Sequence, residues 1–265
     1  MPQVAFRLGA EPVFTITVLM YLGLLSGVFL LAREGLRRGW RRLQALELCA
    51  WAIVPAVLGG RAACVLESWL AEPSQWGHWS QPWGDGLSLP GALVAGAAGL
   101  AMFAGLRRGL SYWEICGAAV PGLALGQALG WLGAAAHGAW AGVPISPARP
   151  WAPLMRDLYG TVLPRFPLQY LAAALSLGVW ALIHTRVRSD RGRVACYALV
   201  TGWGVGALLF AAERRVAVAA GLSAGQIGYA LIGLAGVVLA LVEMTDKRRR
   251  RYPSTQFGSP AVSLE

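Results

Sequence analysis

The sequence predicts an all-α, polytopic membrane protein with seven transmembrane helices and a small cap of loops on its outer face. Hydrophobic residues make up 56% of the 265-residue chain and charged residues 14%, whereas a soluble domain carries roughly 25% charged residues. Several apolar runs reach the ~20 residues that a helix needs to cross a bilayer core of about 30 Å. Basic residues gather in short clusters between these runs. These observations together indicate a single membrane domain.

Seven apolar runs mark the expected spans. Helices are the only structure expected there, because an isolated strand in lipid would leave its backbone N–H and C=O groups unpaired. The second and fourth runs are longer than necessary and should tilt or extend beyond the hydrocarbon. The predicted spans cover residues 13–32, 44–70, 87–106, 110–140, 168–185, 194–212 and 222–243.

Basic residues are unevenly divided between the two sides that these spans define. Sixteen Lys and Arg residues fall in connections on one side and six on the other, while Arg61 lies within a span. Cytoplasmic connections carry the excess of Lys and Arg in membrane proteins. We therefore expect the N-terminus outside and the C-terminus in the cytoplasm. The inward clusters are then residues 33–42, 107–108, 186–193 and 247–251.

Two long connections on the outer side are rich in tryptophan or proline, at residues 72–86 and 141–167. Trp and Tyr favour the headgroup zone of a bilayer, so these loops should lie along the outer leaflet as the cap. With them, residues 1–243 form one membrane domain. The remaining residues, 244–265, are expected to be a basic, disordered cytoplasmic tail.

Charge and cysteine placement exclude several classes of protein. The net charge of +10 does not indicate nucleic-acid binding, because the chain has no basic stripe with interleaved aromatic residues. The four cysteines lie inside apolar runs and not at metal-ligand spacing, so we expect no metal site and no disulfide. We expect no cofactor either. A transporter is disfavoured, since inverted halves with interrupted helices are not evident.

Arg61 is a candidate functional residue because it follows Gly59 and Gly60 in the middle of the second predicted span. A charge at that depth costs a few kcal/mol, so it should have a counter-charge, with Glu67 nearby in the chain, or face a water-filled cavity. A guanidinium can hold a lipid phosphate through two hydrogen bonds. The alternative is a structural role, as an interhelical ion pair or a donor to a carbonyl.

His137 lies in the segment GWLGAAAHGAW, residues 130–140. Its imidazole is suited to proton transfer near neutral pH, so His137 is a candidate acid–base catalyst or ligand. The alternative is a hydrogen bond to a neighbouring carbonyl. Arg214, between Glu213 and Arg215 at the outer end of the sixth span, either belongs to a solvated helix end or faces lipid headgroups.

Six pieces of the chain, in order, resemble the prolipoprotein diacylglyceryl transferase family. Members of this family, in the bacterial inner membrane, move the diacylglyceryl group of phosphatidylglycerol onto a lipobox cysteine thiol, and glycerol 1-phosphate leaves. The resemblance implies phosphatidylglycerol and prolipoprotein signal peptides as partners, Arg61 and Arg214 as phosphate ligands, and supporting roles for Gly130, Gly133, Gly138 and Gln169. The pieces are LGGRAACVLESW, DGLSLPGAL, GQALGWLGAAAHGAW, RPWAP, PRFPLQY and LSAGQIGYALIG.

This sequence departs from the family at several charged positions. The family signature G-R-x-G-N-x-x-N-G-E begins at Gly130 here, and Trp131, Ala134, His137 and Ala139 replace its Arg, both Asn and its Glu. Other family positions become Pro90, Phe166, Ala207 and Ala211. Two hypotheses therefore stay open. The chain is either a divergent diacylglyceryl transferase or a non-catalytic relative that binds a lipid or another membrane protein.

Overall fold

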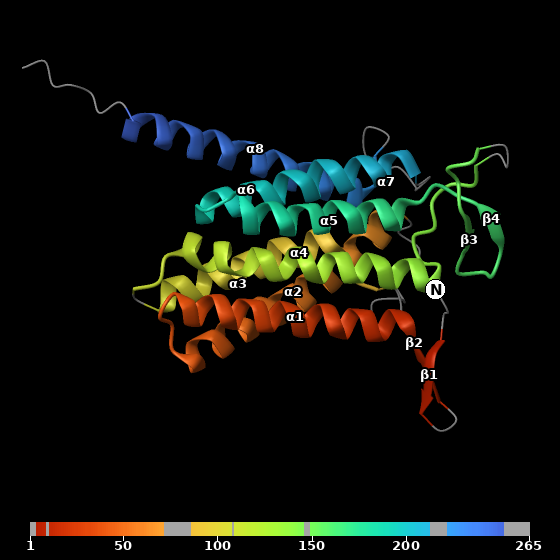
Figure 1. Ribbon diagram of the computed structural model, residues 1–265, viewed down its shortest axis with the longest axis horizontal. Helices are drawn as coiled ribbons and strands as arrows, with labels where there is room; N and C mark the ends of the chain where they lie inside the picture. The colour runs from red at the N-terminus through yellow and green to blue at the C-terminus, as the bar shows by residue number, and fades with distance from the viewer. Residues whose placement is uncertain are drawn as a thin grey trace, which may run out of the picture.

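The computed structural model is a bundle of long antiparallel helices with two small hairpins at one end (Figure 1). It describes residues 4–8, 11–71, 86–107, 109–145, 149–212 and 222–251. The strands are β1 (Val4–Leu8), β2 (Glu11–Phe14), β3 (Leu154–Arg156) and β4 (Val162–Pro164). The helices are α1 (Thr15–Arg37), α2 (Arg42–Ala71), α3 (Leu89–Leu106), α4 (Tyr112–His137), α5 (Leu168–Thr185), α6 (Asp190–Leu199), the π-helix η2 (Val200–Val205), α7 (Gly206–Ala212) and α8 (Ala224–Arg251).

Seven helical segments of the described chain are long and apolar enough to cross a membrane, and α6, η2 and α7 together form the sixth. Large apolar side chains such as Phe29, Leu58 and Leu66 are exposed on the bundle, which is the arrangement expected of helices that face lipid. The prediction of an all-α polytopic membrane protein with seven spans is confirmed.

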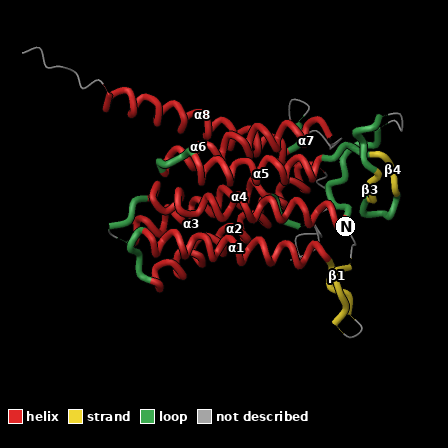
Figure 2. Tube along the Cα trace, in the orientation of Figure 1, coloured by secondary structure: helices red, strands yellow, loops and turns green. Residues whose placement is uncertain are grey.

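The strands lie at one end of the bundle, here called the cap end, and the end where α8 finishes is called the tail end (Figure 2). β1 pairs with β2, and β3 pairs with β4, both antiparallel. The second hairpin lies inside the loop 141–167 that the sequence predicts as part of a cap. The hairpins themselves were not predicted, because strands this short carry too little hydrophobic pattern to be recognised.

Helix α4 is the most buried span and packs against α1, α5 and α6. Glycines allow its close approach to α1. A Cβ atom on Gly122 would lie 2.8 Å from the carbonyl oxygen of Gly27, and one on Gly126 would lie 3.2 Å from that of Gly23. Small residues at such contacts are typical of membrane helix pairs, so these glycines serve the packing of α4 against α1.

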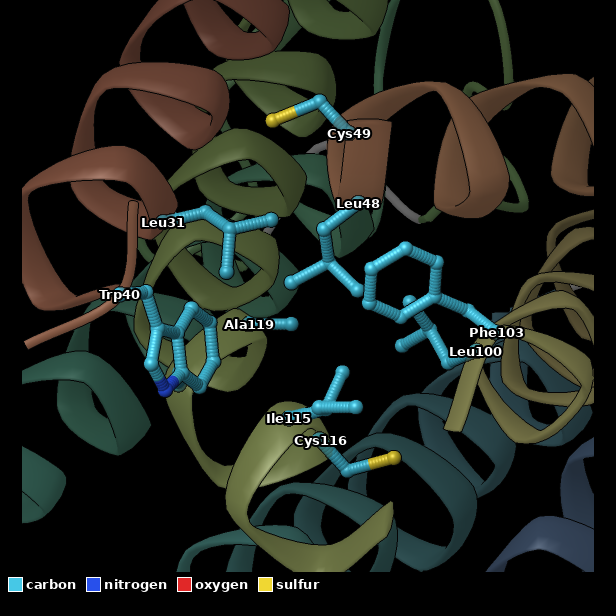
Figure 3. Close-up of a cluster of buried hydrophobic side chains, with 10 residues drawn as sticks. Leu31, Trp40, Leu48, Cys49, Leu100, Phe103, Ile115, Cys116 and Ala119 are labelled. Atoms are coloured by element: carbon cyan, nitrogen blue, oxygen red, sulfur yellow. The ribbon is translucent and has the colours of Figure 1, made fainter. Parts of the chain in front are cut away.

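At the tail end, buried side chains from four helices meet (Figure 3). Leu48 of α2, Phe103 of α3 and Ile115 of α4 are almost fully buried there. This cluster joins the α2–α3 pair to α1 and α4. The labelled members are Leu31, Trp40, Leu48, Cys49, Leu100, Phe103, Ile115, Cys116 and Ala119.

An ion-pair cluster also fastens the tail end. The guanidinium of Arg38 contacts Glu34 at 2.9 Å and Asp190 at 2.8 Å, and Arg193 contacts Glu34 at 3.0 Å. Arg38 also donates a hydrogen bond to the carbonyl oxygen of Glu114. Burial lowers the pKa of Arg38, but hydrogen bonds to Asp190 and Glu34 outweigh this and raise its pKa above the ordinary value. The cluster therefore links α1, α4 and α6 through a charged arginine.

Two elements differ from the prediction. The sixth span is not one regular helix, because η2 widens it where Gly202 meets the backbone of Gly233 in α8. Helix α8 also continues to Arg251 instead of ending at the predicted tail boundary at residue 244. Asp246 accepts a hydrogen bond from Arg191 at 2.8 Å, which ties this extension to α6. The rest of the predicted tail, and all but the last residue of the loop 72–86, lie outside the described residues.

Candidate functional site

A cavity of about 710 Å³ lies between α1, the α2–α3 pair, α4 and α8. Ligand pockets typically measure 300–1,000 Å³. Along α1 the lining residues run from Ile16 to Leu31, a helical distance of about 22 Å. Leu24, Leu93 and Val120 are among the mainly aliphatic walls. An elongated apolar cavity of this kind suits hydrocarbon chains.

Small residues on α4 leave room for the cavity. Gly122, Gly126 and Gly130 all line it at four-residue spacing, so they occupy one face of the helix. A Cβ atom on Gly130 would have no neighbour within 4 Å. Gly130 therefore borders open space, whereas Gly122 and Gly126 also make the contact with α1.

The cap end of the cavity carries polar groups. Glu67 of α2 and Ser88, which precedes α3, both line it, and the Ser88 hydroxyl donates a hydrogen bond to the Glu67 carboxylate at 2.5 Å. Beside this carboxylate, Ser223 and Gln226 exchange two hydrogen bonds at the start of α8, the arrangement of a helix capping box. The cavity therefore has a polar end near the cap and apolar walls deeper in the bundle.

A second polar site lies deeper, on α4. Gln127 lines the cavity, and its side-chain oxygen accepts a hydrogen bond from the Tyr197 hydroxyl at 2.8 Å. Thr201 contacts the same oxygen at 3.4 Å. These bonds join α4 to the sixth span at the point where η2 begins.

Trp131 occupies the position of the family's signature arginine and is 8% exposed. Its indole ring lines the cavity and packs edge-on against Trp140, with the ring centroids 6.2 Å apart. Leu168 and Tyr229 belong to the same buried cluster. Ala134 and Ala139 also line the cavity, so three replaced signature positions face one space.

His137 is the last residue of α4 and is not among the residues that line the cavity. Its ring packs edge-on against Phe14, with the ring centroids 5.9 Å apart. Gly138 follows with φ +83°, and a Cβ atom there would lie 2.7 Å from the carbonyl oxygen of Arg156. Gly138 thus lets the cap approach the end of α4. The catalytic role of His137 stays a prediction.

The other predicted site residues are dispersed. Arg61 donates a hydrogen bond to the carbonyl oxygen of Gly86 at 3.2 Å, as expected for the structural alternative. Arg214 lies outside the described residues. Gln169 is fully buried and donates to the carbonyl oxygen of Ala139 at 2.9 Å, which holds α5 against the end of α4. Phosphate binding by Arg61 and Arg214 therefore stays a prediction.

Gly133 packs against α1, and Glu67 has a different partner from the one that the sequence suggests. A Cβ atom on Gly133 would lie 3.3 Å from Ile16, so Gly133 supports the contact between α4 and α1. The sequence suggests Glu67 only as a counter-charge for Arg61, but in the described part of the chain its carboxylate accepts a hydrogen bond from Ser88. Its position inside an apolar span was the signal, because ionisable residues in membrane spans are functional candidates.

The fold and the cavity define a polytopic membrane protein with a site suited to a lipid. The chain belongs to the prolipoprotein diacylglyceryl transferase family, whose model matches residues 3–242. The family and the seven apolar helices indicate an inner-membrane protein.

Similar proteins include the phosphatidylglycerol–prolipoprotein diacylglyceryl transferases of two bacteria. The Bacillus licheniformis protein is 34% identical over 134 residues, which cover 48% of this chain and 47% of the relative. The Geobacillus kaustophilus protein is 33% identical over 128 residues, with 48% and 47% covered. The matches therefore span about half the length of these curated relatives.

Proposed function

We propose that the protein binds phosphatidylglycerol in the cavity and transfers its diacylglyceryl group to the cysteine thiol of a prolipoprotein. The observation that supports this most is the elongated apolar cavity with a polar end, in a chain of the transferase family. The apolar walls would hold the acyl chains, and the polar end would hold the headgroup. The names of the similar proteins supply the two substrates.

The reaction forms a bond between the thiol sulfur and the glyceryl carbon, and it breaks the bond from that carbon to the phosphate oxygen. Glycerol 1-phosphate leaves with the electron pair. Cations near the leaving phosphate would stabilise this step, and Arg61 and Arg214 are the proposed ligands. His137 is the proposed proton acceptor. It ends α4 and is not among the residues that line the cavity, so in this proposal the thiol meets it at the cap end.

The proposed orientation has the cap end outside and the tail end in the cytoplasm. The excess of Lys and Arg in the connections at the tail end supports this orientation. The polar end of the cavity would then open toward the outer leaflet. A prolipoprotein signal peptide crossing the membrane could present its cysteine there.

A second candidate function is phospholipid binding without transfer. It is favoured by Trp131, Ala134 and Ala139, which line the cavity where the family signature has Arg, Asn and Glu. Removing one preorganised donor typically lowers a rate by about 10²–10³. An indole and two methyl groups carry no charge, and only the indole N–H among them can donate a hydrogen bond.

Complementation distinguishes the two functions. A host depleted of its own transferase is given this chain, and lipoprotein processing is followed by gel mobility. Transfer predicts restored processing that is lost in Arg61→Ala but kept in the control Arg107→Ala, because Arg107 forms an exposed ion pair with Glu47 at the tail end. Normal production of the protein without any restored processing would instead support binding without transfer.

A further inference from the structure

Glu67 places a carboxylate at the polar end of an otherwise mainly apolar cavity. It lies in the last turns of α2, within the membrane span, and its side chain is half-buried. One carboxylate oxygen accepts the hydrogen bond from Ser88. The other, Oε2, is 3.7 Å from the place that a Cβ atom on Gly225 would occupy. The start of α8 therefore lies beside this carboxylate and leaves it room.

The neighbouring charges make this carboxylate unusual. Among the described residues that line the cavity, Glu67 is the only Asp or Glu, and none is Lys, Arg or His. Within the described residues, the hydrogen-bond partner of this carboxylate is the neutral hydroxyl of Ser88. A carboxylate has about four acceptor sites, and placing it in an apolar environment is costly without further hydrogen bonds. An occupant of the cavity that donates hydrogen bonds would offset that cost.

We propose that Glu67 recognises the headgroup of the bound phospholipid by accepting hydrogen bonds from it. The donors are the hydroxyl groups of a glycerol headgroup or the ammonium group of an ethanolamine headgroup. The acyl chains then run along the aliphatic walls toward the tail end. The proposal rests on phospholipid binding as proposed above, and it adds the residue that selects among lipids. It does not require the transfer step.

The test uses the full-length protein in detergent micelles that contain pairs of phospholipids with identical acyl chains. Phosphatidylglycerol competes with phosphatidylmethanol, which has the same charge but no headgroup hydroxyl, and native mass spectrometry counts the bound molecules. We expect phosphatidylglycerol to be preferred about tenfold, as expected for hydrogen bonds to a charged group. Phosphatidylethanolamine is the second competitor and reveals whether an ammonium group is preferred to hydroxyls.

Two variants and one control assign the preference to Glu67. Glu67→Leu removes the acceptor and should bring the ratio of phosphatidylglycerol to phosphatidylmethanol close to one. Glu67→Gln keeps one acceptor oxygen without the charge, so it should retain part of a hydroxyl preference and lose an ammonium preference. Glu47→Gln, at an exposed ion pair with Arg107 far along α2, should leave every ratio unchanged.

The outcomes separate this proposal from the proposed function. The same lipid ratios in wild type and in folded Glu67→Leu would overturn headgroup recognition, whether or not the chain transfers diacylglyceryl groups. A preference that depends on Glu67, in a protein that fails complementation, would support recognition and count against transfer. If phosphatidylethanolamine wins only when Glu67 is present, the ammonium group is the donor.

Discussion

Two glycines on α4 should respond in opposite ways to the same substitution, Gly→Ala. At Gly122 the added Cβ would lie 2.8 Å from the carbonyl oxygen and 3.0 Å from the Cα atom of Gly27. Both neighbours are backbone atoms, so α1 and α4 must move apart. At Gly130 the Cβ would have no neighbour within 4 Å. The two sites are on the same helix and both line the cavity, which makes each the control for the other.

The expected magnitudes combine two effects. Alanine stabilises a helix interior by about 1 kcal/mol relative to glycine, and Gly130→Ala should gain about that amount. Overpacking costs about 1–3 kcal/mol, so Gly122→Ala should lose about 1 kcal/mol after the helix gain is subtracted. The two variants should therefore differ by about 2 kcal/mol in free energy of unfolding.

Reversible unfolding in mixed micelles of increasing SDS content measures this difference, with helicity as the signal. Both proteins must first show wild-type helicity and a single species in size-exclusion chromatography. If Gly122→Ala is as stable as Gly130→Ala, the close contact between α1 and α4 is not present in the folded protein, and the reasoning fails.

Three further predictions concern the tail end, the cap and the cavity. Arg38→Ala should lower the free energy of unfolding by about 2–4 kcal/mol, because it leaves the half-buried Asp190 carboxylate without its partner and Glu34 with Arg193 alone. Arg107→Ala, from an exposed ion pair, should cost less than about 1 kcal/mol in the same SDS titration. Gly138→Ala should cost about 1–2 kcal/mol, because φ +83° strains alanine, and protease should then cut the cap faster; unchanged cleavage would contradict the proposed approach of the cap to α4. Gly130→Leu should fill part of the cavity and reduce the phospholipid retained on purification, measured by lipid mass spectrometry, whereas undiminished retention would locate the lipid elsewhere.

Much of the architecture could be read from hydropathy. The seven spans were predicted within a few residues, because the length of an apolar run is a local property that the bilayer thickness constrains directly. Irregularities were missed where a contact between distant segments creates them. The π-helix η2 sits where Gly202 approaches Gly233, and Asp246, in the part of α8 that continues past the predicted boundary, pairs with Arg191. Neither partner can be recognised from the local pattern.

In the candidate site, too, the sequence identified individual residues, whereas the structure was needed to identify their partners. The family signature drew attention to His137, which packs against Phe14 and away from the cavity lining. Trp131 and Gln169 could be singled out from the same motifs, but not their packing partners. Arg61 was identified by its depth in a span, and the structure adds the carbonyl group that it contacts.

Glu67 illustrates why folding was needed to find the polar end of the cavity. In the chain it stands near Arg61, and charge alone suggests that these two residues pair. In the folded protein it meets Ser88, from the next span, and lies beside Gly225 of α8. Hydropathy along one dimension specifies which segments enter the membrane. Which side chains then share a cavity depends on the rotation and packing of each helix against its neighbours, and those are properties of the assembled bundle.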